Sequence, residues 1–244
     1  MNLILVEPEE ISRRGDAALS GARAEHLLKV LHVAPGHEVR IGVIDGPRGI
    51  GTVQAIADGT VTLRCAFEGA APPLPAIDLL LALPRPKVMR RLWAQIAALG
   101  VGRIILTNAE KVERNYFDTH VLSPETYRPL LIEGLQQARD TRLPLVSIHR
   151  QFKVLVEDQL DMLAGPALRV VADPSAAKPL GEVVRAGNGR RLLLAIGPEG
   201  GWNAFELGLL ADHGFQPAGM GARTLRSDTA CVALLAIARS AMEI

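Results

Sequence analysis

The segment RLLLAIGPEGGWNAFEL, residues 191–207, combines an apolar run with three closely spaced glycines. Gly197, Gly200 and Gly201 follow the run where a buried strand would end. Glycine at the carboxyl end of a parallel strand lets backbone N–H and C=O groups approach a ligand closely. The same glycines are compatible with a strained strand-to-helix turn that binds nothing. The segment therefore indicates either a ligand-binding loop or a demanding turn.

A helix is expected directly after these glycines. Asn203 is a favourable N-cap residue, and Glu206, three positions later, completes the spacing of a capping box. Such a cap contributes about 1 kcal/mol to stability. It explains Asn203 and Glu206 but leaves the three glycines unexplained.

A second glycine-containing segment, GMGARTLRSDTACVALLAIARSAM, covers residues 219–242. Its second half is almost entirely apolar or small, which predicts a buried helix capped by Ser227 or Asp228. Arg223 and Arg226 stand just before this helix, where guanidinium groups need anionic partners or solvent.

These two arginines have a structural and a functional explanation. In the structural one, Arg226 pairs with Asp228 or with Glu199 of the first segment. In the functional one, the guanidinium groups serve a ligand or a reacting group beside the glycine loops.

Other common motifs are absent from the sequence. It contains no GxxxxGK[ST] loop, no GxGxxG after the first strand, and no GxSxG, HExxH or zinc-ligand spacing, so no metal is expected. The six histidines are scattered, and Cys65 and Cys231 form no CxxC pair, which favours a reducing, cytoplasmic setting. No uninterrupted apolar run of about 18 residues predicts a membrane helix. The N-terminus lacks the pattern of a signal peptide.

The first third of the chain is predicted to be rich in short strands. Residues 36–67 read as strands joined by turns, with Asp45-Gly46 and Asp58-Gly59 as turn dipeptides, after a short helix in ARAEHLLKVLHV. Closely spaced short strands are typical of a small β-barrel. The proline-containing stretch 68–76 resembles a linker, so we expect a first domain at 1–72 and a second at 73–244.

The second domain alternates buried strands with helices. The apolar runs IDLLLAL, VGRIILTN, LRVVAD and RLLLAIG are expected as strands. One helix should end before Gly100, and another should begin with Ser123 as N-cap and Pro124 in its first position. This alternation predicts an α/β fold with a mainly parallel sheet.

The formal net charge of +1 conceals a basic middle segment. Residues 84–153 contain 12 Lys and Arg against 6 Asp and Glu, and nine of the 12 are Arg. The planar guanidinium group suits phosphate oxygens, although a solvated surface would also explain the excess.

Taken together, LLLAIGPEGGWNAFEL and GMGARTLRSDTA resemble the paired C-terminal signatures of the 16S ribosomal RNA (uracil-N(3))-methyltransferases, knotted S-adenosylmethionine-dependent enzymes of the SPOUT class. QIAALGVGRIIL is similar to the helix and strand around the family's ELGV-type turn. EGLQQARDTRLP is similar to its EAxEQSxRxxxP element, with Gln137 and Arg139 at matching positions, and AEHLLKVLHVAPGHEVRIGVIDG to the start of its N-terminal barrel. The resemblance covers most of the chain and is most specific in residues 194–231.

The resemblance implies an architecture and a cofactor. A small PUA-like, RNA-binding β-barrel at 1–72 would precede a SPOUT α/β-knot domain with a deep C-terminal trefoil knot at 73–244, in a homodimer. S-adenosylmethionine would bind in the knot, with S-adenosylhomocysteine as product and no metal. The implied cofactor-binding residues are Leu194, Ile196, Gly197, Gly200, Gly201, Met220, Gly221, Leu225 and Arg226.

The implied reaction is methylation of N(3) of a specific uridine in 16S ribosomal RNA, free or in the small subunit. The uracil nitrogen must lose its proton to become a nucleophile, and an arginine near the carbonyl oxygens would stabilise the developing anion. Arg226 is the first candidate and Arg223 the second, while Glu199 or Asp228 could accept the proton. The candidates for RNA binding are Arg85, Arg90, Arg114, Arg139, Arg142 and Arg223.

Four departures from the family pattern leave alternatives open. WAQIAALG lacks the usual lysine, NAEKVERNYF replaces a compact SERS-type segment, LRSDTA replaces LRxETA, and His32 replaces an arginine. Three of these changes fall at expected RNA-facing positions. The alternatives are therefore another RNA position or class as acceptor, or a non-catalytic RNA-binding protein with the same fold.

Overall fold

The computed structural model describes residues 2–223 and 225–242 of the chain, so the outer ends of the two expected domains lie outside the described residues. The chain forms two compact units. The first consists of residues 1–74 together with 132–143, and the second of residues 75–131 together with 144–244. The sequence suggested two consecutive stretches, whereas a short later segment groups with the first unit.

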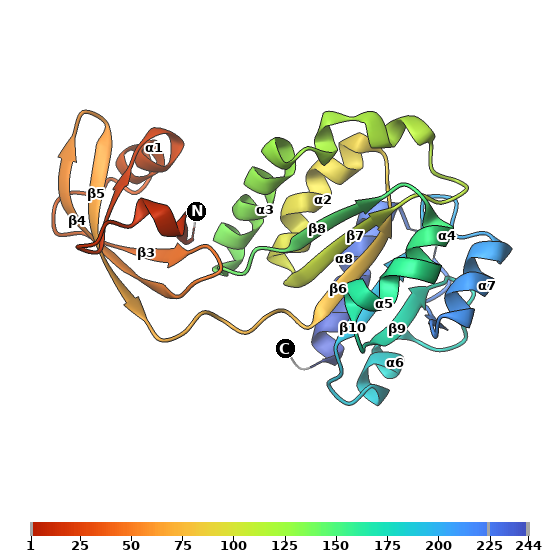
Figure 1. Ribbon diagram of the computed structural model, residues 1–244. Coiled ribbons are helices and arrows are strands. Elements are labelled where there is room, and N and C mark those ends of the chain that lie inside the picture. The colour runs from red at the N-terminus through yellow and green to blue at the C-terminus, as the bar shows by residue number, and fades with distance from the viewer. Residues whose placement is uncertain (1, 224, 243–244) are drawn as a thin grey trace. The chain divides into compact units, whose positions relative to one another are not determined.

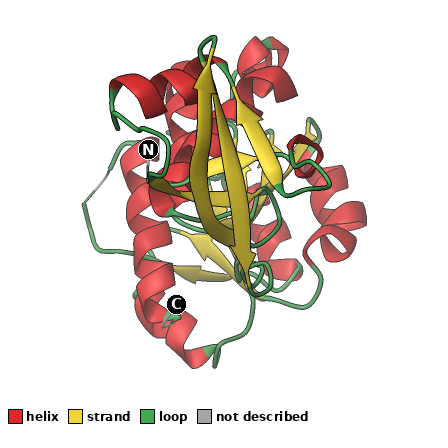
Figure 2. Ribbon diagram, turned by 90° about the vertical axis from the view of Figure 1, so that its left-hand side faces the viewer, coloured by secondary structure: helices red, strands yellow, loops and turns green. Residues whose placement is uncertain are grey.

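The first unit contains a curled five-stranded sheet, whose strands Figure 2 shows in yellow. The strand order is β1-β3-β4-β5-β2, and only the β1–β3 pair is parallel. The elements of this unit are β1 (Ile4–Val6), a 3-10 turn (Pro8–Glu10), β2 (Asp16–Leu19), α1 (Gly21–Lys29), β3 (Glu38–Val43), β4 (Arg48–Ala57) and β5 (Thr60–Glu68).

The long hairpin of β4 and β5 turns at the predicted dipeptide. Asp58 and Gly59 both have positive φ, +48° and +72°, as a two-residue type I′ turn requires. The core of this unit combines fully buried side chains of α1 and of the strands, such as Leu27, Ile41 and Leu63. The short helix and the hairpin predicted from the sequence are therefore confirmed.

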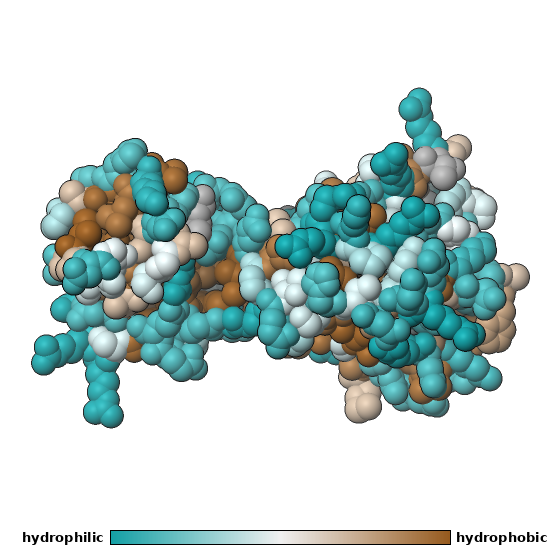
Figure 3. All heavy atoms as spheres, turned by 90° about the horizontal axis from the view of Figure 1, so that it is seen from above, coloured by the Kyte–Doolittle hydropathy of each residue, from teal (hydrophilic) through white to brown (hydrophobic). Residues whose placement is uncertain are grey.

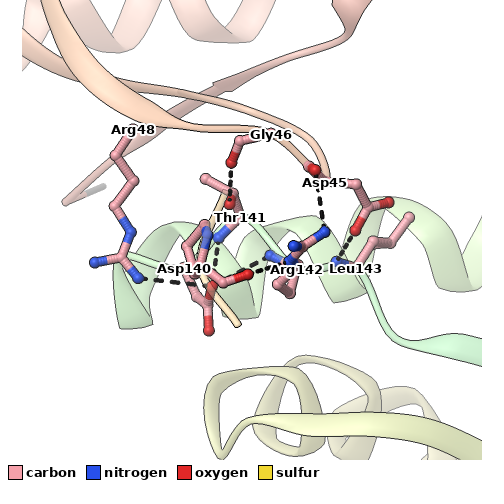
Figure 4. Close-up of polar contacts among 8 residues, drawn as sticks. Asp45, Gly46, Arg48, Asp140, Thr141, Arg142 and Leu143 are labelled. Carbon is pink, nitrogen blue, oxygen red and sulfur yellow. Dashed lines mark hydrogen bonds and ion pairs between the residues drawn. The ribbon is translucent and has the colours of Figure 1, made fainter. Parts of the chain in front are cut away.

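Residues 140–143 bind the turn between β3 and β4 (Figure 4). The buried Thr141 hydroxyl donates to the Gly46 carbonyl at 2.7 Å, and the Thr141 carbonyl accepts from the Asp45 amide at 2.8 Å. A Cβ atom at Gly42 would lie only 2.6 Å from Thr141 Cγ2. A glycine in β3 thus lets this later segment pack directly on the strand.

The second unit contains a six-stranded sheet in which all pairs are parallel, in the order β11-β9-β10-β6-β7-β8. The strands are β6 (Ile77–Ala82), β7 (Val101–Thr107), β8 (Leu145–His149), β9 (Leu168–Ala172), β10 (Leu192–Ile196) and β11 (Gln216–Ala218). Every residue of β6 and β10 is buried, as the continuous apolar runs predicted. The expected α/β fold with a parallel sheet is confirmed.

Helices cover both faces of this sheet, with α4 and α5 on one face and α8 on the other (Figure 1). Helix α8 packs against α2 and α6. The helices are α2 (Pro86–Ala98), α3 (Pro124–Ala138), α4 (Phe152–Val154), α5 (Leu160–Ala164), α6 (Leu180–Ala186), α7 (Ala204–Asp212) and α8 (Ser227–Ala241). A π-helical turn (Leu155–Gln159) joins α4 to α5, and 3-10 turns (Arg114–Asp118, His120–Leu122) precede α3.

The predicted helix ends are largely confirmed. Gly100 follows α2 with a φ of +73°, and Pro124 is the first residue of α3. Asn203 caps α7: its side chain accepts from the Glu206 amide at 2.8 Å, and the Glu206 carboxylate accepts from the Asn203 amide at 2.7 Å.

The predicted cap of α8, Ser227 or Asp228, is wrong, because both residues lie inside the helix. Arg226 is the N-cap residue, and Ser227 is already helical. The reason is that both expected capping groups have other partners. The Ser227 hydroxyl donates to Glu199 at 3.2 Å, and the Asp228 carboxylate accepts from Arg91 at 2.7 Å.

On the face seen in Figure 3, both hydrophilic and apolar residues lie at the surface of each unit. Within the described residues, no helix has the length and apolar character needed to cross a membrane.

Candidate functional site

The carboxyl ends of β9, β10 and β11 border a cavity of about 330 Å³ in the second unit. Its walls include two loops, residues 196–202 after β10 and residues 218–221 after β11. Because the strands are parallel, their carboxyl ends lie at one edge of the sheet and bring these loops together. The remaining wall includes Leu225, just before α8, and Ser227, Ala230 and Leu234 of that helix.

Most of the predicted cofactor-binding residues line this cavity, namely Ile196, Gly197, Gly200, Gly201, Met220, Gly221 and Leu225. Leu194 is fully buried inside β10, and Arg226 is exposed at the N-cap of α8; neither belongs to the cavity wall as described. Glu199 and Arg223, predicted for other roles, do line it. The two glycine segments therefore meet at one site.

Glycine is required in these loops for two reasons: some positions have no room for a Cβ atom, and others have a positive φ. A Cβ atom at Gly197 would lie 3.1 Å from the Trp202 ring, and one at Gly219 would lie 3.0 Å from a backbone carbonyl. Gly201 and Gly221 have φ values of +69° and +106°, which residues with a Cβ atom rarely adopt. A Cβ atom at either position would have no neighbour within 4 Å, so conformation and not space requires glycine there. The loops are thus demanding turns that also expose main-chain atoms to the cavity.

Glu199 connects the loop after β10 to the start of α8. Its carboxylate Oε1 accepts from the Ser227 hydroxyl at 3.2 Å and from the Arg85 backbone amide at 3.5 Å. The residue is exposed at the rim of the cavity. The Glu199 carboxylate thus joins the loop to α8 at a position that solvent can reach.

Asp228 is held differently. The hydrogen bond from Arg91 holds the pKa of the Asp228 carboxyl below its usual range, and the Thr229 amide adds to this effect. A carboxylate with a lowered pKa is a weaker base. The structure pairs Asp228 with Arg91, whereas the sequence suggested Asp228 or Glu199 as the partner of Arg226.

Comparison with known proteins places this geometry in a family. Residues 71–239 match the RNA methyltransferase domain. A protein of Treponema pallidum named ribosomal RNA small subunit methyltransferase E is 30% identical, over 97% of this chain and 90% of its own length. The chain belongs to the RNA methyltransferase family.

A further sequence relative and a solved structure are also similar to the chain over almost its full length. Ribosomal RNA small subunit methyltransferase E 1 of Borreliella burgdorferi is 25% identical over 98% of both chains. The crystal structure of a ribosomal RNA small subunit methyltransferase E from Neisseria gonorrhoeae, bound to S-adenosyl methionine, is 20% identical and superposes with a TM-score of 0.77. It covers 98% of this chain and 97% of the neisserial one, so the two share their fold over almost the full length.

The arginines predicted to bind RNA are divided between the two units of this RNA methyltransferase. Arg85, Arg90, Arg114 and Arg223 belong to the second unit, where all four are exposed. Arg139 and Arg142 belong to the first unit. The Arg142 guanidinium donates to the carbonyl of Asp45 at 3.2 Å and to that of Pro72 at 2.5 Å, so it already has a structural role.

Two sets of residues beside these sites were missed by sequence reasoning. Arg40 and Arg48 join Arg139 around a hollow of about 390 Å³ in the first unit. Arg40 and Arg48 lie in the first third of the chain, where acidic residues outnumber basic ones, so the charge distribution did not indicate a basic site there. Lys111 contacts the loop after β10, but it lies in a segment that departs from the family pattern. Among the described residues, no group of three or more His, Cys, Asp or Glu could hold a metal ion.

The pair of Arg91 and Asp228 predicts a pH-dependent stability. A carboxyl whose pKa is lower in the folded state stabilises that state above its unfolded pKa, and loses this effect as the pH falls through the folded value. Arg91 is 58% exposed, so Arg91→Gln should cost less than about 1 kcal/mol at pH 7. The difference should shrink as the pH falls below about 4, the unfolded value of the carboxyl.

Urea unfolding of both proteins between pH 7 and pH 3 measures this difference. Arg90→Gln, which changes an exposed arginine on the same helix, is the matched control. A stability gap for Arg91→Gln that stays constant on acidification would contradict the assignment.

Proposed function

We propose that this protein transfers a methyl group from S-adenosylmethionine to N(3) of a uridine in 16S ribosomal RNA. The observation that carries the proposal is the cavity in which both glycine-bearing loops meet, in a chain of the RNA methyltransferase family. Relatives over nearly the whole chain are named small-subunit ribosomal RNA methyltransferases, and a protein of the same fold binds S-adenosyl methionine.

The cavity suits a nucleoside with a positively charged sulfur. Apolar side chains such as Ile196, Leu207 and Leu234 offer surfaces for an adenine ring, and the glycine loops offer backbone donors and acceptors. When bound, S-adenosylmethionine supplies the methyl group and leaves as S-adenosylhomocysteine. Glu199 at the rim is compatible with a nearby sulfonium, because their charges are opposite.

The chain's own residues would then prepare the acceptor. Arg226, at the N-cap of α8, would stabilise the negative charge that develops on the uracil carbonyl oxygens, assisted by the positive end of the helix dipole. Arg223, which lines the cavity, is the second candidate for this role. Glu199 would accept the proton of the uracil nitrogen.

The finer features of the fold are part of the proposal. A trefoil knot in residues 73–244 would bring the two glycine loops together, and a PUA-like barrel at 1–72 would bind RNA. The Gly219 amide donates to the Lys178 carbonyl at 3.0 Å, and the Gly219 carbonyl accepts from the Leu180 amide at 2.7 Å, so the second loop is tied to the chain before α6. A crystal structure in which the C-terminal segment passes through no loop of the preceding chain would contradict the knot.

The resemblance to the family also supports a proposal for assembly and location. We propose a homodimer that acts in the cytoplasm, where ribosomal RNA is found. Sedimentation equilibrium should give twice the 26.2 kDa of one chain, and a monomer at micromolar concentration would contradict the dimer.

Mapping of methylated nucleotides tests the reaction. With S-adenosylmethionine and 16S ribosomal RNA or small subunits that lack the modification, the protein should create one new block to reverse transcription, at a uridine. Arg226→Ala should reduce the rate by at least about 100-fold, because a donor to the developing anion is lost. Calorimetry should show nearly unchanged cofactor affinity.

The other outcomes distinguish the alternatives. Normal turnover by Arg226→Ala would remove this residue from the mechanism. A methyl group on another atom or another RNA would change the acceptor. RNA binding without cofactor binding would identify a non-catalytic protein of the same fold.

The hollow of the first unit supports an RNA-binding role for that unit. Arg40 on β3 and Arg48 on β4 line it together with Arg139, against a single acidic residue, Glu68. Arg48 also approaches Asp140 at 3.7 Å (Figure 4). We propose that this positively charged hollow binds RNA phosphates.

The double variant Arg40→Gln/Arg48→Gln tests this binding site. Each lost phosphate contact should reduce the slope of log affinity against log salt by about 1 and weaken binding uniformly across RNA sequences. Filter binding at several salt concentrations measures both quantities. Arg13→Gln/Arg14→Gln, two exposed arginines that do not line the hollow, should leave the slope unchanged. Equal effects of the two double variants would mean that general charge, not the hollow, is responsible.

A further inference from the structure

The segment between β7 and the following 3-10 turn, residues 108–113, lies against the loop after β10. Two neighbouring residues make hydrogen bonds, one with α7 and one with the loop. The Glu110 amide donates to Glu206 Oε1 at 2.7 Å, and Lys111 Nζ donates to the Gly200 carbonyl at 2.6 Å. This segment replaces the SERS-type segment of the family pattern, and the structure gives it a contact with the cavity wall.

The peptide between Gly200 and Gly201 is held at both of its polar ends. Its carbonyl accepts from Lys111, and its amide donates to the Pro198 carbonyl at 2.8 Å. A rotation of this peptide would break both hydrogen bonds. Such a rotation is otherwise easy between two glycines, because neither has a Cβ atom to restrict it. Both glycines line the cavity, so the orientation of this peptide determines which groups the wall presents.

The aliphatic part of Lys111 also fits Gly200 closely. A Cβ atom at Gly200 would lie 2.6 Å from Lys111 Cδ. The lysine stem therefore lies directly over the glycine, and its ammonium group reaches the carbonyl beyond. Gly200 thus permits the approach of Lys111 as well as the exposure of the main chain.

The backbone that carries Lys111 has its own anchor. The Glu206 carboxylate is buried, with 3% of the residue exposed, and it accepts from the amides of Asn203 and Glu110, both at 2.7 Å. One carboxylate therefore fixes both the start of α7 and the residue next to Lys111. The backbone next to Lys111 is therefore held in place, and from it the lysine side chain reaches the Gly200 carbonyl.

We propose that Lys111 is a positioning residue that holds the Gly200–Gly201 peptide in the orientation needed to bind S-adenosylmethionine. The proposal rests on the proposed function of the cavity. Lys111 is not one of the residues that line the cavity, so it acts through the main chain of the loop. The ammonium group restricts a glycine pair that would otherwise sample several conformations.

The variant Lys111→Met keeps the apolar stem and removes the donor. The Kd of S-adenosylhomocysteine, measured by calorimetry without RNA, should rise about 5- to 10-fold, as expected for a lost charge-assisted hydrogen bond. The KM for S-adenosylmethionine should rise equally, while the KM for RNA and kcat at saturating cofactor stay within about twofold. Lys111→Arg, which keeps a donor, should recover most of the affinity. Lys87→Met, at an exposed lysine of α2, is the control.

Amide hydrogen exchange provides a readout that needs no ligand. The Gly201 amide should exchange faster in Lys111→Met than in the wild type, because the peptide is released at its other end. Unchanged exchange and unchanged affinity would overturn the proposal. A higher KM for RNA with unchanged cofactor affinity would also overturn it, since Lys111 would then contact RNA. If the wild type bound no cofactor, the proposed function would fail, whereas the exchange rates would still show whether Lys111 holds the loop.

Discussion

Backbone atoms can line a cavity only where no side chain covers them. The cavity of the second unit depends on this constraint. The buried strand β10 ends in a loop whose glycines leave main-chain groups uncovered, and the loop after β11 does the same. Such loops lack the restraint that side chains normally provide. Hydrogen bonds from distant parts of the chain hold these loops instead. In the loop after β10, Lys111 donates to the Gly200 carbonyl and Glu199 accepts from the Ser227 hydroxyl of α8. In the loop after β11, the Gly219 amide donates to the Lys178 carbonyl.

Features that depend on neighbouring residues in the chain could be predicted from the sequence. The apolar runs of β6 and β10, the capping box of Asn203 and Glu206, and the turn at Asp58-Gly59 each depend on residues close together in the chain. Short-range propensities determine such features, so the pattern alone was sufficient. That the two glycine loops meet at one site could be expected only from the family resemblance, because it depends on strand order, a long-range property.

Features that depend on distant partners could not be predicted in this way. Asp228 would be a natural cap for α8, but Arg91, 137 positions earlier, binds its carboxylate. Thr141 packs on Gly42, about a hundred positions away, and nothing in either local sequence indicates that contact. The hollow of Arg40, Arg48 and Arg139 arises in the same manner, from segments that meet only in the folded chain.

The return of residues 132–143 to the first unit has a consequence for how this protein can be divided. The backbone passes between the two units three times, near residues 74, 131 and 143. A gene fragment that stops at the first passage would omit Thr141 and leave its place beside Gly42 unfilled. Any exchange of the first unit between homologous enzymes must therefore transplant two separate stretches of sequence.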